Sequence, residues 1–443
     1  NVTGTSTDAS VGGVCGYRYN GNIDNCYNTG NITGTSVVGG VCGAIYTGQT
    51  SNCYSTGNVT CDASDASNAT VGGVCGYQNG AIKSCYYDTG KFTGKAIHTS
   101  TTSSQTVYVE GKTSEQFSNG VVAYLLNSRS AEDSPVWYQN IDNGDAQDTS
   151  PVLDSSHGTV YASLPCKKEF SNEAKTVEHT FQGYRCTVCG ELQPPQLNAA
   201  GAYEIKNAND LIWFAELVNG TLLVDRDPLA DAVLVADITF EAEQNFTAIG
   251  SSSSPYSGTF DGAGFTVTVN QKGSDEVALF GCIGDCTIKN LTVTGTITTS
   301  AKYAAGIAMQ VLNNTTATIE KCMSNVTIDS SIDGDGTHGG LVGVVDGTLN
   351  INNACFTGKM TGSTTNSCGG MVGYSSNRVT IKNSYVAADF SSIGSENGNT
   401  FARGNVTLVN CYYLNEMNAT PSGAVLKTAD EVANGYVTNL LNG

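Results

Sequence analysis

Three cysteines and one histidine near the middle of this chain have the types and spacing of a metal site. They are Cys166, His179, Cys186 and Cys189, in the order Cys-x12-His-x6-Cys-x2-Cys. Two cysteines separated by two residues on a tight turn present both thiolates to one face of a tetrahedral ion, and Gly190 lets the backbone bend around them. The more distant cysteine and histidine complete a closed Cys3His set. The pattern predicts one structural zinc ion, with no open coordination position for catalysis.

A disulfide and redox chemistry are the competing interpretations of the same residues. A disulfide within this segment leaves one of the three cysteines without a local partner. A redox Cys-x-x-Cys normally begins a helix in a β-α-β setting, and no such setting is indicated here. A segment of roughly 30 residues buries too little apolar surface to fold unaided, which favours the metal.

Calcium is a weaker hypothesis, and it concerns two acidic stretches of the chain. The first contains Asp142, Asp145 and Asp148, and the second contains Asp333 and Asp335. Neither stretch has the 12-residue spacing and terminal glutamate of an EF-hand loop. We therefore expect solvated turns at both places and no bound calcium.

The remaining ionisable residues do not form a recognisable catalytic set. A β-helix enzyme acting on acidic polysaccharides needs clustered carboxylates with Arg or Lys beside them. Here Asp261 lies in the turn sequence Phe-Asp-Gly-Ala-Gly, and Asp389 stands alone. The sequence contains no nucleophile elbow, HExxH helix or phosphate-binding loop. We expect no enzymatic activity, and we expect His98, His157 and His338 to be solvated turn residues.

A repeated motif indicates the elements that must position these residues. Gly-Gly, a cysteine, Asn-Cys-Tyr (Ser-Cys-Tyr in the third copy) and Thr-Gly recur in that order three times in the first hundred residues, with the second cysteine at Cys26, Cys53 and Cys85. A fixed period of this size, with β-formers and turn glycines but no helical stripe, is typical of a solenoid. Helical repeats need longer amphipathic segments than these glycines allow. The coils are therefore predicted to be short strands and turns, which is a parallel β-helix.

Equivalent positions of successive coils should form columns. Adjacent members of the cysteine column are close enough for a disulfide, but three members leave one unpaired. We expect mostly free, buried thiols that act as small apolar fillers, and serine takes the same slot at Ser384. A tyrosine column has two interpretations: a stacked ladder that fills or shields the coil, or an exposed strip that binds glycan. Its members are Tyr27, Tyr54 and Tyr86.

The motif returns more loosely after residue 230, and a second β-helix of about seven coils of 25–30 residues is predicted there. An amphipathic helix should precede it, with Asn207 as N-cap, Trp213 in the core and Gly220 as its stop. Such a helix covers the unpaired strand edges at the end of a solenoid. The matching segments 112–127 and 427–442 predict further short helices, capped by Thr113 and Thr428.

The predicted organisation is an all-β chain of tandem β-helix modules with short capping helices, read as part of a longer tandem array. Composition points away from nucleic acid and anionic lipid as partners, because the net charge is −19. No apolar stretch approaches the ~18 residues of a membrane span. The expected segments are the last coils of one β-helix (1–94), a capping helix and small β-cap (95–165), a zinc-ribbon-like linker (166–195), a second β-helix with its N-terminal capping helix (196–415), and the start of a further capping element (416–443).

The order of several segments resembles large bacterial cell-surface proteins with GLUG-type repeats. These are "YEIKNANDLIWFAELVNG", "FTAIGSSSSPYSGTFDGAGFTVT", "ALFGCIGDCTIKNLTVTG", "GGLVG" and "NCY", and "HTFQGYRCTVCG" is similar to a linker that often precedes such modules. The resemblance implies right-handed parallel β-helices in adhesin-like or stalk regions outside a bacterial cell, sometimes attached to a secreted peptidase. This chain departs from the usual pattern in its many cysteines, and it has no sortase motif or recognisable catalytic domain.

Two non-enzymatic functions follow from this organisation. One is a rigid spacer whose partners are neighbouring modules of the same long chain, with the zinc linker fixing the angle between β-helices. The other is a module that binds host glycans or proteins along its flank. An enzyme acting on polysaccharide is the third and weakest hypothesis.

Overall fold

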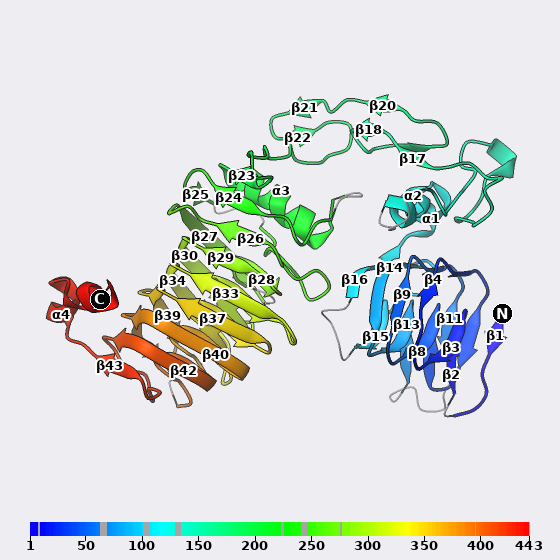
Figure 1. The fold of residues 1–443 in the computed structure, drawn as a ribbon. Coiled ribbons are helices and arrows are strands. Elements are labelled where there is room, and N and C mark those ends of the chain that lie inside the picture. The colour runs from blue at the N-terminus through cyan, green and yellow to red at the C-terminus, as the bar shows by residue number, and fades with distance from the viewer. Residues whose placement is uncertain are drawn as a thin grey trace. The chain divides into compact units, whose positions relative to one another are not determined.

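The computed structural model describes residues 1–7, 9–62, 69–100, 106–128, 134–222, 226–240, 246–274, 277–394 and 396–442. The chain forms two compact units, Asn1–Glu191 and Leu192–Gly443. Each unit contains a stack of short parallel strands (Figure 1). The predicted parallel β-solenoid is confirmed in both.

Short strands of the first unit stack in parallel sheets, one strand from each coil. Val11, Val38 and Val71 occupy one register position in successive coils, and Cys15, Cys42 and Cys75 occupy another. The strands are β1 (Val2–Thr3), β2 (Ser10–Gly12), β3 (Cys15–Arg18), β4 (Ile23–Asp24), β5 (Tyr27–Asn28), β6 (Ile32–Gly34), β7 (Val37–Gly39), β8 (Cys42–Ile45), β9 (Gln49–Ser51), β10 (Tyr54–Ser55), β11 (Val59–Cys61), β12 (Thr70–Gly72), β13 (Cys75–Gln78), β14 (Ala81–Asp88), β15 (Ile97–Ser100) and β16 (Thr106–Lys112).

The stack of the first unit continues past residue 94. Strand β15 pairs with β13, and β16 pairs with β14, so that Glu110 lies beside Tyr86 and Val109 beside Cys85. Residues 95–112 lack the Gly-Gly and Asn-Cys-Tyr motifs. For that reason the sequence pattern predicts that the first β-helix ends at residue 94. The backbone of this segment nevertheless forms the hydrogen bonds that extend the parallel sheets. Val109 is buried at the position that the motif cysteine occupies in the other coils.

The residue before the repeated interior cysteine turns the chain. Asn25, Asn52 and Ser84 have φ of 52°, 51° and 48°, in the left-handed region. Asparagine tolerates this conformation better than most residues, which explains its place in the motif. The turn then directs the following side chain inward, and Cys53 and Cys85 are buried. All sixteen cysteines of the chain are free thiols, as predicted for the repeat.

Two short helices follow the first stack, α1 (Ser114–Ser118) and α2 (Val121–Ser128). The predicted N-cap of α1 is confirmed: the N–H of Gln116 donates to Thr113 Oγ1, and Gln116 Oε1 accepts the N–H of Thr113. Residues 134–172 then form the small cap, in which η3 (Gly144–Ala146) precedes the antiparallel pair β17 (Tyr161–Ala162) and β19 (Phe170–Ser171).

The tyrosine ladder of the first unit lies beneath this cap. The rings of Tyr27 and Tyr54 stack with centroids 5.3 Å apart and an interplanar angle of 14°. Phe117 and Trp137 each lie 5.4 Å from the ring of Tyr54, whose hydroxyl donates to the carbonyl of Pro151. Tyr54 and Trp137 are fully buried. The shielding interpretation is therefore confirmed for Tyr54 and Tyr86, which are fully buried, whereas Tyr27 remains 39% exposed.

The second unit begins with the predicted capping helix, α3 (Ala208–Asn219). Its N-cap is Asn207, which accepts the N–H of Asp210 at 3.1 Å, and Gly220 ends it with φ of 74°. Trp213 is buried, as predicted. The helix covers one end of a continuous 19-stranded parallel sheet (Figure 1).

Strands of the second unit coil around one apolar interior. In register, Ala232, Phe260, Ile288, Ile319, Ile351, Ile381 and Leu408 mark seven coils that are 27 to 32 residues apart, which confirms the predicted number. The strands are β23 (Tyr203–Ile205), β24 (Ala232–Leu234), β25 (Ile238–Thr239), β26 (Thr259–Asp261), β27 (Thr266–Gly273), β28 (Phe280–Ile283), β29 (Thr287–Lys289), β30 (Thr292–Thr299), β31 (Tyr303–Ala305), β32 (Ala308–Val311), β33 (Thr316–Glu320), β34 (Met323–Ser330), β35 (Thr337–Gly339), β36 (Val342–Val345), β37 (Thr348–Asn352), β38 (Cys355–Phe356), β39 (Lys359–Gly362), β40 (Val372–Val386), β41 (Asp389–Ile393), β42 (Ala402–Tyr413) and β43 (Ala424–Leu426).

The left-handed turn also recurs in the second unit. Asn353, Asn383 and Asn410 have φ between 48° and 53°. The amide of Asn410 donates to Asn383 Oδ1 at 2.9 Å, which links two successive coils on the outside of the turn. The unit ends with α4 (Ala429–Ala433) and α5 (Tyr436–Asn442), and Thr428 caps α4 as predicted. Every helix in the described residues is too short or too polar to span a bilayer.

His338 is not a solvated turn residue, and that expectation is wrong. It lies in β35 at 1% exposure, beside Ala304 of the preceding coil, with Nε2 2.8 Å from Ser330 Oγ. Burial lowers its pKa to about 4. His157 is half-buried, and its Nδ1 lies 2.6 Å from Asp148 Oδ2. Contacts with residues outside the local turn position both histidines: Ala304 of the preceding coil for His338, and Asn140 for His157.

Candidate metal centre

Four very short strands position the predicted ligands in residues 164–190 of the first unit. They are β18 (Leu164–Pro165), which pairs with β20 (Thr176–Val177), and β21 (Phe181–Gln182), which pairs with β22 (Arg185–Cys186). The N–H of Cys166, just after β18, donates to the carbonyl of Val177 at 2.9 Å. This bond brings the first cysteine next to the strand that leads to His179.

A tight turn carries the last two cysteines. The N–H of Gly190 donates to the carbonyl of Cys186 at 2.8 Å, and Gly190 adopts φ of 79°. The N–H of Val188 points at Cys186 Sγ, 3.4 Å away. Glycine takes this left-handed conformation without a steric penalty, so the residue after the second cysteine has the role inferred for it.

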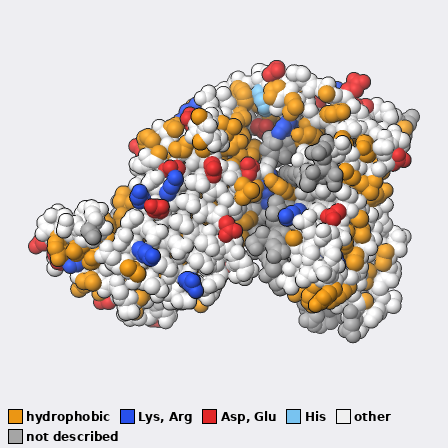
Figure 2. Space-filling model, viewed as in Figure 1, with side chains coloured by type: hydrophobic (Ala, Val, Ile, Leu, Met, Phe, Trp, Pro, Cys, Tyr) orange, Lys and Arg blue, Asp and Glu red, His pale blue; other side chains and the backbone are white. Residues whose placement is uncertain are grey.

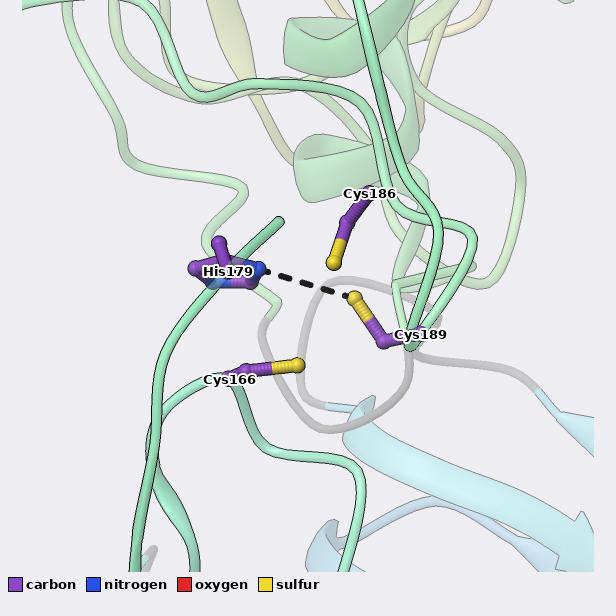
Figure 3. A group of neighbouring side chains, drawn as sticks. All are labelled: Cys166, His179, Cys186 and Cys189. Carbon is purple, nitrogen blue, oxygen red and sulfur yellow. Dashed lines mark hydrogen bonds between the residues drawn. The ribbon is translucent and has the colours of Figure 1, made fainter. Parts of the chain in front are cut away.

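The structure brings all four predicted ligands together. The thiols of Cys166, Cys186 and Cys189 and a ring nitrogen of His179 lie within 4.8 Å of one another. The four side chains point toward a common centre (Figure 3). Cys189 Sγ lies 3.7 Å from His179 Nδ1. A tetrahedral ion with ligand bonds of about 2.0–2.3 Å needs ligand atoms about 3.5–3.8 Å apart. The Cys189–His179 pair already meets this spacing, and the widest separations in the cluster would have to shorten by about 1 Å.

The thiols of the cluster differ in acidity. Burial opposes ionisation of Cys186, but the backbone N–H of Cys189 and the ring of His179 outweigh it and lower the pKa of Cys186 to about 6. Burial, with the neighbouring thiols of Cys166 and Cys186, raises the pKa of Cys189 to about 12. Burial also raises the pKa of Cys166. Three crowded thiols thus favour a single thiolate, and a divalent cation is the charge that would allow all three to ionise.

Very little apolar packing supports this segment. Between residues 166 and 190, the buried apolar side chains among the described residues are those of Cys166 and Cys186. The ring of Phe181 stacks on His179 at 5.2 Å and is half-buried, while Tyr184 is 51% exposed. Apolar packing therefore contributes little to the cohesion of this segment.

The carboxylates considered for catalysis are engaged in turns and ion pairs. Asp261 Oδ1 accepts the N–H of Ala263 at 2.9 Å, which confirms the predicted Asx-type turn. Its other oxygen lies 3.4 Å from Lys289 Nζ. Partial burial opposes the shift, but these groups and Asn290 lower the pKa of Asp261. The hydroxyl and N–H of Ser391 lower the pKa of Asp389 to about 2.

The acidic stretches considered for calcium also make protein contacts. Asp142 Oδ2 accepts the hydroxyl of Ser171 at 2.8 Å and the N–H of Asn172 at 2.7 Å. Asp335 pairs with Lys302 at 2.7 Å, and this contact lowers the pKa of Asp335. The side chain of Asp145 lies outside the described residues.

An exposed tyrosine cluster escaped the sequence analysis. Tyr17 and Tyr19 are 53% and 70% exposed, and both rings lie near Tyr46, at 5.4 and 6.4 Å. Tyr46 is 37% exposed and lies 5.5 Å from Tyr77 of the next coil. The signal was present in the tyrosines that follow the first cysteine of each copy, in "CGYRY", "CGAIY" and "CGYQN".

Comparison with known proteins supports the repeat assignment. Residues 7–33 match the family model described as the GLUG motif, so the first complete coil carries it. No curated protein matches the chain. One solved structure, a "putative immunoglobulin A1 protease" from Bacteroides ovatus, is similar at 19% identity with a TM-score of 0.42, over 54% of this chain and 88% of that one.

Proposed function

We propose that this chain is a non-catalytic structural region of a bacterial cell-surface protein, whose β-solenoid units act as a spacer. The GLUG motif supports an extracellular location, because GLUG repeats occur in extracellular proteins. The solenoids support the spacer, because each coil adds length while contacting only its neighbours. The partners in this proposal are neighbouring modules of the same long chain.

The Cys3His cluster is the observation that carries the proposal. Four ligands form a closed set, which leaves no coordination position for a substrate or an attacking water. The cluster lies in a segment with almost no core of its own. A structural zinc there would supply the folding free energy that packing does not. A spacer needs such an element, because an unstructured linker would make its units flexible.

The state of the carboxylates supports the non-catalytic part of the proposal. A glycoside hydrolase needs one carboxyl group with a raised pKa as general acid, close to a second carboxylate. Asp261, Asp335 and Asp389 instead have lowered pKa values and lie beside lysine or serine donors. Their ionised carboxylates accept hydrogen bonds from turn residues or pair with lysine, which is a structural role.

Metal analysis tests this proposal directly. Purified chain is expected to contain about one zinc per chain, since four ligands form one site. Cys186→Ser should lose most of the zinc, and Cys61→Ser, which changes a half-buried cysteine of β11 outside the cluster, should retain it. Chelation should speed amide exchange between residues 166 and 190 and broaden the distance distribution in solution scattering. A chain that holds no zinc and is unchanged by Cys186→Ser would contradict the proposal.

Flank binding to glycan is the second candidate, favoured by the exposed cluster of Tyr17, Tyr19, Tyr46 and Tyr77. Aromatic faces on neighbouring coils can stack on sugar rings, and amide and hydroxyl groups stand in the adjacent turns. A glycan array should then give hits that Tyr46→Ala abolishes. Tyr161→Ala, which removes another exposed tyrosine of the first unit, is the matched control. An array without hits would contradict glycan binding and leave the spacer as the single proposed function.

A further inference from the structure

The same helix pair ends the strand stack in both units. In the first unit, the capping box of Thr113 precedes α1 and α2, and Lys112 lies 6.0 Å over the ring of Tyr86. In the second unit, the capping box of Thr428 precedes α4 and α5, and Lys427 lies 5.6 Å over the ring of Tyr412. The two pairs thus occupy equivalent places on their solenoids.

In the first unit, a following segment covers this pair. Phe117, Val121, Val122, Leu125 and Leu126 are all buried. The indole of Trp137 packs on the tyrosine ladder beside them.

The side-chain amide of Asn127, near the end of α2, holds the backbone of the covering segment. Its Oδ1 accepts the N–H of Trp137 at 3.0 Å, and its Nδ2 donates to the carbonyl of the same residue at 2.8 Å. A paired contact of this kind recognises a peptide backbone, because it needs a donor and an acceptor on one residue.

In the second unit, the equivalent surface is open. Val437, which corresponds to Val122, is the one buried residue of α4 and α5 in the described chain. Tyr436 is 45% exposed, and Val425 and Leu426 of β43 are 52% and 58% exposed. Hydrophobic side chains are visible over this end of the unit (Figure 2).

The ladder beneath the second pair is also uncovered. Tyr385 and Tyr412 are in register, as Tyr54 and Tyr86 are in the first unit. Tyr54 and Tyr86 are fully buried, whereas Tyr385 and Tyr412 are only half-buried. When the matching segments 112–127 and 427–442 are aligned, Asn442 at the end of α5 corresponds to Asn127 near the end of α2.

We propose that α4, α5 and the Tyr385–Tyr412 ladder form a docking seat for a polypeptide segment with the chemistry of residues 134–172, arriving from the C-terminal side of α5. Its anchor is an indole that lies on the ladder, with the backbone of that residue held by the amide of Asn442. The occupant is a peptide rather than a glycan, because the first unit fills the same seat with a Trp side chain and a clamped peptide unit. The seat is independent of the metal cluster.

Appending a copy of residues 128–172 after Asn442 tests this seat in the full chain. Amide hydrogen exchange across Tyr436–Asn442 is expected to slow by about tenfold or more, because burial converts local fraying into opening of a packed unit. The same extension with Trp137→Ala in the appended copy is the control and should leave exchange fast. Asn442→Ala in the extended chain should remove most of the protection.

Two results would overturn the proposal. The first is unchanged exchange in α5 with the intact extension. The second is equal protection from the Trp137→Ala extension, which would mean that any added polypeptide suffices. Asn127→Ala in the unextended chain checks the clamp itself: exchange in α2 should accelerate, and unchanged exchange there would remove the basis for assigning Asn442.

Discussion

The indole of Trp137 lies against the ring of Tyr54, with centroids 5.4 Å apart and an interplanar angle of 55°. Tyr54 belongs to a coil of the first solenoid, and Trp137 belongs to the cap that follows it, 83 positions further along the chain. Both side chains are fully buried. The contact makes the tyrosine ladder a packing surface for the cap.

Trp137→Ala is therefore expected to destabilise the first unit by about 3–5 kcal/mol, as for other fully buried aromatic side chains. Urea unfolding of the full chain measures this, followed by amide exchange in α1 and α2 to locate the effect. Tyr161→Ala removes an exposed aromatic from the same cap and should cost much less. If the two substitutions lower the free energy of unfolding equally, the contact between Trp137 and the ladder does not stabilise the first unit.

The left-handed turn can be tested at Asn353, where φ is 53°. Asn353→Ala should destabilise the second unit by about 1 kcal/mol, because a Cβ-bearing residue without a local polar group pays a steric penalty in this region. Asn353→Gly should be nearly neutral, since glycine adopts positive φ freely. Denaturant midpoints give the comparison. If alanine is tolerated as well as glycine, backbone conformation is not what selects asparagine in the motif.

His338 should make stability depend on pH. Burial lowers its folded pKa to about 4, below the value of about 6.5 expected in the unfolded chain. A histidine buried in its neutral form contributes stability above the unfolded pKa, and that stability falls as pH drops from about 6.5 toward 4. The loss is roughly 3 kcal/mol at most.

His338→Cys is the matched variant, because Cys368 occupies the equivalent position in the next coil, one residue before the Gly339–Gly369 bridge. Unfolding free energies at pH 7 and pH 4.5 should differ less in this variant than in the native chain. The carboxylates titrate in both proteins, so the difference between them isolates the histidine. Parallel pH profiles would exclude His338 as the source.

The cysteine columns should resist alkylation in the folded chain. Burial raises the pKa of Cys75 well above its usual value, and Cys42 is raised to about 12 by burial and by the thiol of Cys15. The reactive thiolate is scarce at neutral pH in both cases. Outside the metal cluster, half-buried Cys15 and Cys61 should react first with iodoacetamide, and the buried repeat cysteines should react only on unfolding. Mass spectrometry without reduction measures the order, and widespread disulfides would contradict it.

Local sequence carried enough information for the solenoid and for the metal cluster. A turn and a short strand are predicted within a few residues by Gly-Gly, the interior cysteine and the Asn before it. The prediction is stronger because the same motif recurs in each coil. The four ligands of the cluster lie within 24 residues, from Cys166 to Cys189, so their spacing alone constrained a common centre. The helix caps at Thr113, Asn207 and Thr428 are equally local.

The tertiary structure alone decided which of two groups of tyrosines is covered. Tyr54 and Tyr46 both lie among short strands of the first unit, and neither local sequence distinguishes a covered side chain from an exposed one. Tyr54 is buried because Phe117, Trp137 and Pro151 reach it across the chain, while no such cap reaches Tyr46 within the described residues. Whether a solenoid flank is buried depends on the segments that pack against it, which are distant in sequence. The repeat motif determines only the conformation within one coil.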